Sequence, residues 1–471
     1  MKIFKNYLYN TTYQLLAIIV PLVTLPYITR VLGAQSYGVY SFTNATISYF
    51  VLAANLGLSL YGTKKIAQHR DDEVQRSRIF FEIARLKIWV TLAVVAAFAI
   101  FLIFYRQYEI ILLAQAVNIL AVGFDVSWFF MGLEDFKRIT IRNIAVKLLS
   151  LFLIFTLVHH SGDVLIYTLI VAGSTFFGNL SLLPFLKGQL DWQAHRGLHA
   201  WQHLWPALVL FVPQVATQIY LVVNKTMLGE LSSLKAVAYF SSADSIVRLA
   251  LTIVTSLSTV LMPRIAHAAA QKAHDEVRGY MVTSFEFMNC LGVLLVAGMA
   301  SLAPTVIPVF LGQQFAEVGQ LIVVESPVIL LICWSSAIIT QYLIPYEKSQ
   351  HYTIATILGA AVNILANSFL IAHRGASGAV LATLISELVV MIYLLKIMAA
   401  FMPVYQLFHR FFTMLLAGAV AYLLGHFLLD HLHSIWLAVP TTVLLETAAY
   451  LLVLTLLKMP WWRLVNFRND A

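Results

Sequence analysis

The sequence predicts an all-α, polytopic membrane protein with fourteen transmembrane helices. Hydrophobic residues make up 60% of its 471 positions and charged residues only 11%, whereas a soluble domain carries about 25% charged residues. Fourteen apolar stretches are close to the length of about 20 residues with which a helix crosses a bilayer. They lie near residues 10–32, 37–62, 79–105, 108–132, 139–159, 163–186, 204–229, 237–262, 280–305, 317–345, 351–372, 376–398, 409–429 and 434–457.

The positive charges alternate between the two sides of this predicted topology. With the N-terminus inside, the inner loops and tails hold twenty-one of the thirty Lys and Arg residues, and the outer side holds four. Cytoplasmic loops of membrane proteins collect Lys and Arg, so we expect both termini in the cytoplasm. The net charge of +8 is scattered among short loops, and we therefore expect no nucleic-acid partner.

The first twelve predicted spans form two halves of six. A weak internal repeat supports this pairing, because Lys-Ile-Ala at 65–67 recurs as Arg-Ile-Ala at 264–266. Halves with an even number of spans share their orientation, so their pseudosymmetry axis runs along the membrane normal. We expect an N-lobe at 1–186, a cytoplasmic linker at 187–203, a C-lobe at 204–398, and two extra C-terminal helices with a cytoplasmic tail at 399–471.

The first span carries Pro21 and Pro26 and is followed by Gly33. Proline removes a helical hydrogen bond, and in lipid the freed carbonyl group needs a partner from protein or water. We therefore expect this span to bend and to line a cavity.

Polar side chains form stripes at helical spacing on four predicted spans. A charge near the bilayer centre costs about 2.5–3.5 kcal/mol on insertion scales, so Lys225 and Arg248 are expected to face protein or water. Several helices that each turn a polar face inward predict a hydrated cavity between the lobes. The stripes comprise Ser41, Asn44, Ser48, Asn55 and Ser59 in the second span, Gln115, Asn118 and Asp125 in the fourth, Gln214, Thr217, Gln218, Asn224 and Lys225 in the seventh, and Ser241, Asp244, Ser245, Arg248, Thr252, Thr255, Ser256 and Thr259 in the eighth.

These stripes also have structural alternatives. Asp244 and Arg248 stand four residues apart and can neutralise each other on one helix. Serine and threonine stripes also serve to pack membrane helices together. Asn363 and Asn367 are better explained by hydrogen bonds between helices than by ligand binding.

Carboxyl groups within the spans are candidates for binding a coupling proton or cation. The candidates are Asp125, Glu325 and Glu387, and Glu446 is favoured least because it lies outside the paired halves. For each of them the alternative is a neutral, hydrogen-bonded carboxyl group, since burial favours the uncharged form of an acid.

No catalytic or cofactor motif occurs in the sequence. It has no Walker motif, no glycine-rich phosphate loop and no His or Cys at metal-ligand spacing. Asp71, Asp72 and Glu73 lie in a short, basic-flanked loop and are explained as a solvated acidic run. The two cysteines, Cys290 and Cys333, lie in apolar spans and predict no disulfide. We therefore expect no catalytic residue, cofactor or metal.

Several segments of the chain carry a family resemblance. They are PLVTLPYITRVLGAQSYGVYSF (21–42), YGTKKIAQHRDD (61–72), DVSWFFMGLEDFKRITIRNIAVKLLS (125–150), NKTMLG (224–229), VLMPRIA (260–266) and GAAVNILANSFLIAHRGASGAVLATLISE (359–387). They resemble Wzx-type polysaccharide and O-antigen repeat-unit flippases of the multidrug/oligosaccharidyl-lipid/polysaccharide exporter (MOP) superfamily. Related proteins carry an acidic residue where Asn224 precedes Lys225, which argues against a cation site there.

The resemblance implies two lobes around a central cavity that works by alternating access in the bacterial cytoplasmic (inner) membrane. The implied cargo is a polyprenyl-diphosphate-linked oligosaccharide, with membrane lipids, a polysaccharide polymerase and export machinery as further partners. Its anionic diphosphate requires positive charge, and its glycan requires polar side chains that replace water. The predicted substrate-binding residues are Arg30, Asn44, Ser48, Gln214, Gln218, Lys225, Ser241, Asp244, Arg248 and Thr252.

Three other functions remain as alternatives. A peptidoglycan lipid-precursor flippase shares the fourteen-helix plan. A multidrug or cation antiporter of the same superfamily should favour acidic over basic cavity residues, which the surplus of Arg and Lys argues against. A membrane polysaccharide polymerase or glycosyltransferase would carry a large outer loop with catalytic acids or arginines, whereas the predicted outer loops are only a few residues long.

Overall fold

The computed structural model describes residues 2–195, 197–432 and 434–459. Side chains are described from residue 19 onward, except those of residues 195, 212–214, 216, 217, 219–221, 256–261 and 263. Helices and turns make up these ranges, and no strand occurs within them, which confirms the predicted all-α fold. The chain forms two compact units, unit 1 at Met1–Thr226 and unit 2 at Met227–Ala471.

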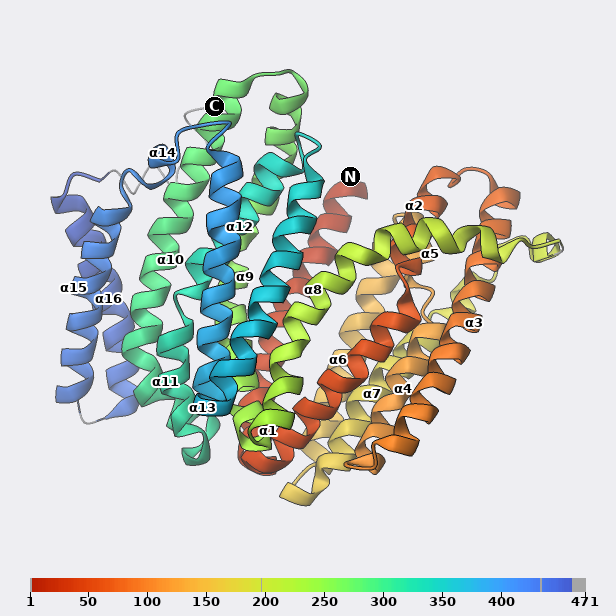
Figure 1. The fold of residues 1–471 in the computed structure, drawn as a ribbon, viewed down its shortest axis with the longest axis horizontal. Coiled ribbons are helices and arrows are strands. Elements are labelled where there is room, and N and C mark those ends of the chain that lie inside the picture. Colours follow the sequence, from red (N-terminus) through yellow and green to blue (C-terminus); the bar gives the residue numbers. More distant parts are fainter. Residues whose placement is uncertain (1, 196, 433, 460–471) are drawn as a thin grey trace. The chain divides into compact units, whose positions relative to one another are not determined.

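Unit 1 is a bundle in which α1 packs against α3, α4, α6 and α7, and α2 packs against α3 and α5 (Figure 1). The 187–203 segment, which we expected to be a linker, consists of short turns between α7 and α8. The helices are α1 (Lys2–Asn55), α2 (Leu58–Gln68), α3 (Glu73–Phe104), α4 (Glu109–Gly123), α5 (Ser127–Gly132), α6 (Phe136–Leu157), α7 (Val164–Leu180) and α8 (Leu204–Leu231), the last of which begins in unit 1 and ends in unit 2.

Helix α1 contains two segments that meet at Gly33. A straight helix of its 54 residues would extend about 80 Å, far more than the roughly 30 Å of the bilayer hydrocarbon. Gly33 has φ 71° and ψ 173°, a conformation that glycine adopts without a Cβ clash. The chain keeps helical geometry through Pro21 and Pro26, and the break in helical geometry lies at Gly33.

Unit 2 contains a second bundle, in which α9 packs on α10, α11, α12 and α13. Helix α15 packs on both α10 and α16, so the two C-terminal helices lie side by side at the edge of this unit (Figure 1). The helices are α9 (Leu234–Ala270), α10 (His274–Leu311), α11 (Ala316–Glu325), α12 (Val328–Ile338), α13 (Ser349–Met398), α14 (Tyr405–Phe408), α15 (Phe411–His431) and α16 (Ile435–Leu456).

Two predicted spans of unit 2 have broken geometry. Helices α11 and α12 differ in direction by 46° across a short break, and a π-helical turn at Ile339–Leu343 follows α12. Helix α13 is divided at Gly375, which has φ 52°, as the predicted boundary between two spans requires. Within the described residues, ten helices are long and apolar enough to cross a membrane, or eleven if the bent pair counts as one span. The protein is therefore a multi-pass membrane protein, and the count of fourteen stays a prediction.

The 187–203 segment is fixed to the N-terminal half of α3. The Glu82 carboxylate is buried, and its Oε2 atom lies 2.8 Å from His203 Nε2. Its Oε1 atom accepts a hydrogen bond from the His199 backbone N–H at 3.0 Å, and Gln202 Nε2 donates to Oε2 at 3.0 Å. The Tyr61 hydroxyl of α2 lies 2.9 Å from His203 Nδ1. Glu82 therefore joins the segment to α3, and His203 extends the contact to α2.

Glu82→Gln should release the 187–203 segment. One carboxylate oxygen would become an amide NH2 group, which cannot accept the hydrogen bonds that the segment now donates to Glu82. Leaving a buried donor unpaired costs about 1–3 kcal/mol. We expect faster tryptic cleavage after the exposed Lys187 in purified protein. Glu73→Gln is the matched control, because Glu73 is exposed on the same helix. Equal cleavage rates in the two variants would contradict this docking.

Gly378→Ala should destabilise unit 2, because a Cβ atom at Gly378 would lie 2.2 Å from the backbone oxygen of Leu370 on the other segment of α13. Backbone atoms in a packed core shift little, and overpacking costs about 1–3 kcal/mol. We expect a lower melting temperature in detergent. Gly279→Ala in α10 is the control, since a Cβ there meets no atom within 4 Å, and it should keep the wild-type melting temperature or raise it.

Candidate functional site

The polar stripes predicted on the second and fourth spans meet in one pocket of unit 1. This polar pocket has a volume of about 310 Å³ and lies among α1, α2, α4 and α7. It is lined by Asn44, Ile47, Ser48, Val51, Asn55, Ser59, Asn118, Ala121, Val122, Asp125, Thr175 and Asn179. Residues three or four apart share one face of a helix. Each polar stripe therefore lies on one helix face, and the two faces turn toward the same pocket.

Asp125, which lines the polar pocket, forms an ion pair with Lys87, which lies outside the lining. Lys87 is 1% exposed, and its Nζ lies 3.4 Å from Asp125 Oδ2. The same Nζ donates to the Asp125 backbone oxygen at 2.9 Å and to Ser59 Oγ at 3.2 Å. Three acceptors therefore surround an ammonium group, which has three N–H bonds.

The Asp125 carboxylate also shapes the break between α4 and α5. Its Oδ1 atom accepts hydrogen bonds from the Ser127 backbone N–H at 3.0 Å and the Ser127 hydroxyl at 2.5 Å. A side chain that bonds to the backbone two residues later forms an Asx turn. Asp125, which we predicted as an ion-coupling residue, thus has a resident cationic partner and a structural role.

Amide side chains connect the walls of the polar pocket. Gln115 Oε1 accepts from Asn118 Nδ2 at 3.0 Å and lies 3.5 Å from Asn44 Nδ2. Asn179 Nδ2 donates to the Ala121 backbone oxygen at 2.8 Å. These bonds tie α1, α4 and α7 together, so the polar lining is built into the bundle.

Three polar residues in or next to this pocket belong to none of the predicted stripes. Thr175 and Asn179 lie four residues apart on α7, so their spacing was a usable signal. Lys87 is a lysine inside an apolar span, and such residues are functional candidates by default. Their partners could not be identified from the sequence, because Lys87 and Asp125 are 38 positions apart.

The remaining predicted residues of unit 1 lie outside the polar pocket. Arg30 and Gln218 are exposed, and Lys225 is half-buried beside the buried Asn224. Gln214 belongs to the positions whose side chains are not described. Arg30, Gln218 and Lys225 do not contribute to the lining.

Some side chains of the predicted stripe on α9 are buried within unit 2 and others are exposed. Arg248 Nε donates to Asp244 Oδ1 at 2.7 Å. The two side chains are therefore paired on one helix, as the structural alternative predicted. The Arg248 side chain is 36% exposed and that of Asp244 only 9%, so the arginine occupies the open side of the pair. Ser241 is buried, whereas Thr252 is exposed.

The other candidate carboxylates are buried in unit 2. Glu325 is 1% exposed at the end of α11, and Glu387 is 6% exposed on α13. On the facing segment of α13, Asn367 Nδ2 donates to Asn363 Oδ1 at 2.9 Å, and Asn363 Nδ2 donates to Ser386 Oγ at 3.4 Å. These bonds support the structural explanation of Asn363 and Asn367.

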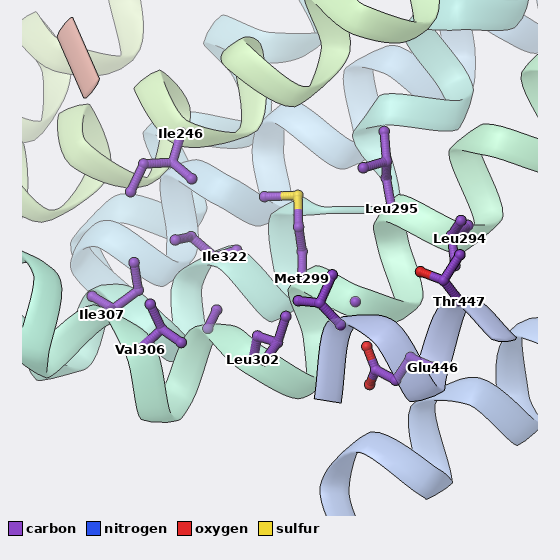
Figure 2. Close-up of a pocket in the computed structure, with 13 residues that line it drawn as sticks. Ile246, Leu294, Leu295, Met299, Leu302, Val306, Ile307, Ile322, Glu446 and Thr447 are labelled. Carbon is purple, nitrogen blue, oxygen red and sulfur yellow. The ribbon is translucent and has the colours of Figure 1, made fainter. Parts of the chain in front are cut away.

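Unit 2 also holds an apolar pocket of about 320 Å³ among α9, α10, α11 and α16. Figure 2 shows apolar side chains such as Ile246, Met299 and Leu302 around it, with the Glu446 carboxyl group at its edge. Glu446 is 2% exposed, and its Oε1 accepts a hydrogen bond from Ser301 Oγ at 2.5 Å. The carboxyl group therefore has a protein partner, and the rest of the lining is almost entirely apolar.

Comparison with known proteins places the chain in a family. Residues 3–269, more than half of the chain, match the family described as polysaccharide biosynthesis protein. The chain belongs to the polysaccharide biosynthesis protein family. Residues 179–445 of this family member also match the model of the lipid II flippase MurJ.

Two relatives of this chain are each named "Putative O-antigen transporter". The protein from Shigella dysenteriae is 24% identical over 386 residues, which cover 80% of this chain and 95% of the relative. The protein from Escherichia coli (strain K12) is 22% identical over 374 residues, which cover 77% of this chain and 88% of the relative.

Solved structures confirm the fold expected of this family member. The lipid II flippase MurJ in an inward closed conformation superposes with a TM-score of 0.71 at 13% identity, covering 96% of this chain and 98% of the other. A multidrug resistance MATE transporter of the MOP superfamily, in an inward-facing conformation, gives a TM-score of 0.61 at 13% identity, covering 82% and 98%. The fold is the one shared by MurJ and this MATE transporter, and the family match at residues 3–269 confirms the predicted family.

Lys87→Met should destabilise unit 1 of this family member, because it leaves the Asp125 carboxylate without its cation. Breaking a buried ion pair costs about 3–5 kcal/mol, so we expect a markedly lower melting temperature in detergent. The double variant Lys87→Met/Asp125→Asn should recover part of the loss. Lys137→Met is the control, since Lys137 is exposed in the same unit. A melting temperature for Lys87→Met equal to that of the control would contradict the pairing.

Proposed function

We propose that this protein is a flippase for polyprenyl-diphosphate-linked oligosaccharide repeat units. It moves them from the inner to the outer leaflet of the bacterial cytoplasmic membrane for export of cell-surface polysaccharide. The observation that carries the proposal is the alignment with two proteins named as O-antigen transporters over 95% and 88% of their length. The polysaccharide biosynthesis family match supports the same function. A flippase is a transporter, so the chain needs no catalytic residue.

The two pockets suit the two chemical parts of such a substrate. The polar pocket of unit 1 offers amide and hydroxyl groups, which replace the hydration that a glycan loses inside a membrane. The apolar pocket of unit 2 offers aliphatic side chains, which suit an isoprenoid chain. A lipid-linked glycan requires both kinds of surface, whereas a small cation requires neither of this size.

The charged residues on α1, α8 and α9 supply a site for the diphosphate in this proposal. Arg30, Lys225 and Arg248 would contact its oxygens, because arginine and lysine form strong charge-assisted bonds to phosphate. Arg248 is half-exposed while its partner Asp244 is buried, which suits an arginine that meets a ligand. The other proposed substrate contacts are Asn44, Ser48, Gln214, Gln218, Ser241, Asp244 and Thr252, which alternating access would expose to each side of the membrane in turn.

A coupling proton or cation would bind Glu325 or Glu387 more readily than Asp125. Asp125 faces the Lys87 ammonium group, and an entering cation would have to compete with it. Glu325 and Glu387 remain proposed coupling residues, because both are buried carboxylic acids inside the predicted spans. Both termini would lie in the cytoplasm, and a polysaccharide polymerase and export machinery would receive the product.

A peptidoglycan lipid precursor is the second candidate cargo. Residues 179–445 match the MurJ family, and the MurJ fold covers 96% of the chain. Both candidate cargoes are polyprenyl diphosphates that carry a polar headgroup, so they differ in the sugar and peptide portion. Translocation assays with each lipid therefore distinguish the two cargoes.

Arg248→Ala should slow translocation of lipid-linked oligosaccharide by at least about tenfold, since a charge-assisted hydrogen bond contributes about 1.5–3 kcal/mol. The full-length protein is reconstituted in vesicles with the native lipid-linked oligosaccharide or with lipid II. Headgroup exposure in each leaflet is then followed with a membrane-impermeant oxidant. Arg248→Lys should restore part of the rate, because lysine keeps the charge but lacks the planar fork.

Arg264→Ala is the matched control, because Arg264 is exposed on the same helix. A wild-type rate for Arg248→Ala would remove Arg248 from the site. Absence of translocation of both lipids by the wild-type protein would overturn the proposed function. Faster movement of lipid II than of the oligosaccharide lipid would establish the second candidate.

A further inference from the structure

We propose that the polar pocket of unit 1 binds one uncharged sugar unit of the cargo. The inference rests on the proposed function and adds what the pocket recognises. Its volume of about 310 Å³ lies at the lower end of the roughly 300–1,000 Å³ typical of ligand pockets. The pocket therefore has room for a single sugar unit of a repeat.

The charges around the pocket disfavour a cation. The Asp125 carboxylate is compensated by the Lys87 ammonium group at 3.4 Å. A second positive group lies behind the wall, where Arg142 Nη1 donates to Asn179 Oδ1 at 2.7 Å. A cation in the pocket would thus face one lining carboxylate, with two positive side chains bonded to lining residues from outside the pocket.

The hydrogen bonds of the pocket also disfavour an anion. The Lys87 Nζ atom has three acceptors within 3.4 Å, two of them on Asp125 and one on Ser59. An ammonium group has three N–H bonds, so no N–H of Lys87 remains for a phosphate or carboxylate. An anion would also lie beside the Asp125 carboxylate, which accepts from Ser127 and Lys87.

The lining offers both donors and acceptors, as a hydroxyl-rich ligand requires. Asn118 and Asn44 each use the Nδ2 atom toward Gln115, which leaves their Oδ1 atoms as acceptors. Asn55 accepts from Ser59 Oγ through Oδ1 at 2.7 Å, which leaves its Nδ2 as a donor. A sugar hydroxyl donates one hydrogen bond and accepts two, so it can satisfy both kinds of group.

Thr175→Val tests the pocket with a nearly isosteric change. Thr175 lines the pocket, and its hydroxyl donates to the Val171 backbone oxygen at 3.1 Å, so its lone pairs can accept from a sugar. Thr168 on the same helix makes the equivalent bond to Val164 at 2.7 Å and does not line the pocket. Thr168→Val is therefore the matched control. Asn118→Leu is a second variant, in which an aliphatic side chain of similar size replaces the amide.

The test is ligand-observed saturation-transfer NMR on the purified full-length protein with a panel of neutral methyl glycosides. Sodium chloride and inorganic pyrophosphate are added as competitors. We expect at least one glycoside to bind, Thr175→Val and Asn118→Leu to weaken its binding about fivefold to tenfold, and Thr168→Val to bind as the wild type does. Neither competitor should displace the glycoside.

Three results would overturn the proposal. They are no glycoside binding at millimolar concentrations, equal binding by the Thr175→Val and Thr168→Val variants, and displacement of the glycoside by sodium or pyrophosphate. The vesicle assay separates this inference from the proposed function. Translocation without pocket-dependent glycoside binding would refute the sugar site alone, and glycoside binding without translocation would refute the flippase function alone.

Discussion

The pairing of Lys87 with Asp125 is the interaction on which the architecture of unit 1 depends. Hydrocarbon offers no hydrogen-bond partner, so polar groups inside a membrane protein must be satisfied by the protein or by enclosed water. One ammonium group here bonds to the carboxylate and backbone oxygen of Asp125 and to Ser59. It thereby joins α3 to α2 and to the break between α4 and α5, and two of its partners, Ser59 and Asp125, line the pocket.

The same helix carries a second buried polar group five residues earlier. Glu82 binds His203, Gln202 and the His199 backbone, so the segment after α7 is held by α3 as well. Elements joined by several buried hydrogen bonds move together, because separating them would leave each partner unsatisfied. We therefore expect α2, α3 and the 187–203 segment to move together, and the motions of transport to fall outside these contacts.

Periodicity predicted the fold and part of the site because both depend on local spacing. The stripe of Asn44, Ser48 and Asn55 and the stripe of Asn118 and Asp125 each mark one helix face, and the structure brings these faces together. Pairs between distant residues could not be predicted this way, since neither Glu82 nor His203 carries a local signal for a partner 121 positions away. The break between α4 and α5 had as its signal only Gly123 and the short polar side chains of Asp125 and Ser127.

Charge balance separates a sugar site from an ion site more sharply than polarity does. Asparagine, serine and threonine oxygens suit a sodium ion as well as a hydroxyl group, so the lining alone leaves both ligands open. The resident lysine decides between them, because it supplies the positive charge that a carboxylate would otherwise take from solution. A neutral, hydroxyl-bearing guest then gains hydrogen bonds without disturbing the ion pair. A neutral sugar can thus dissociate from the pocket without the release of a bound ion. Such reversible binding suits a protein that must bind and release a sugar in each transport cycle.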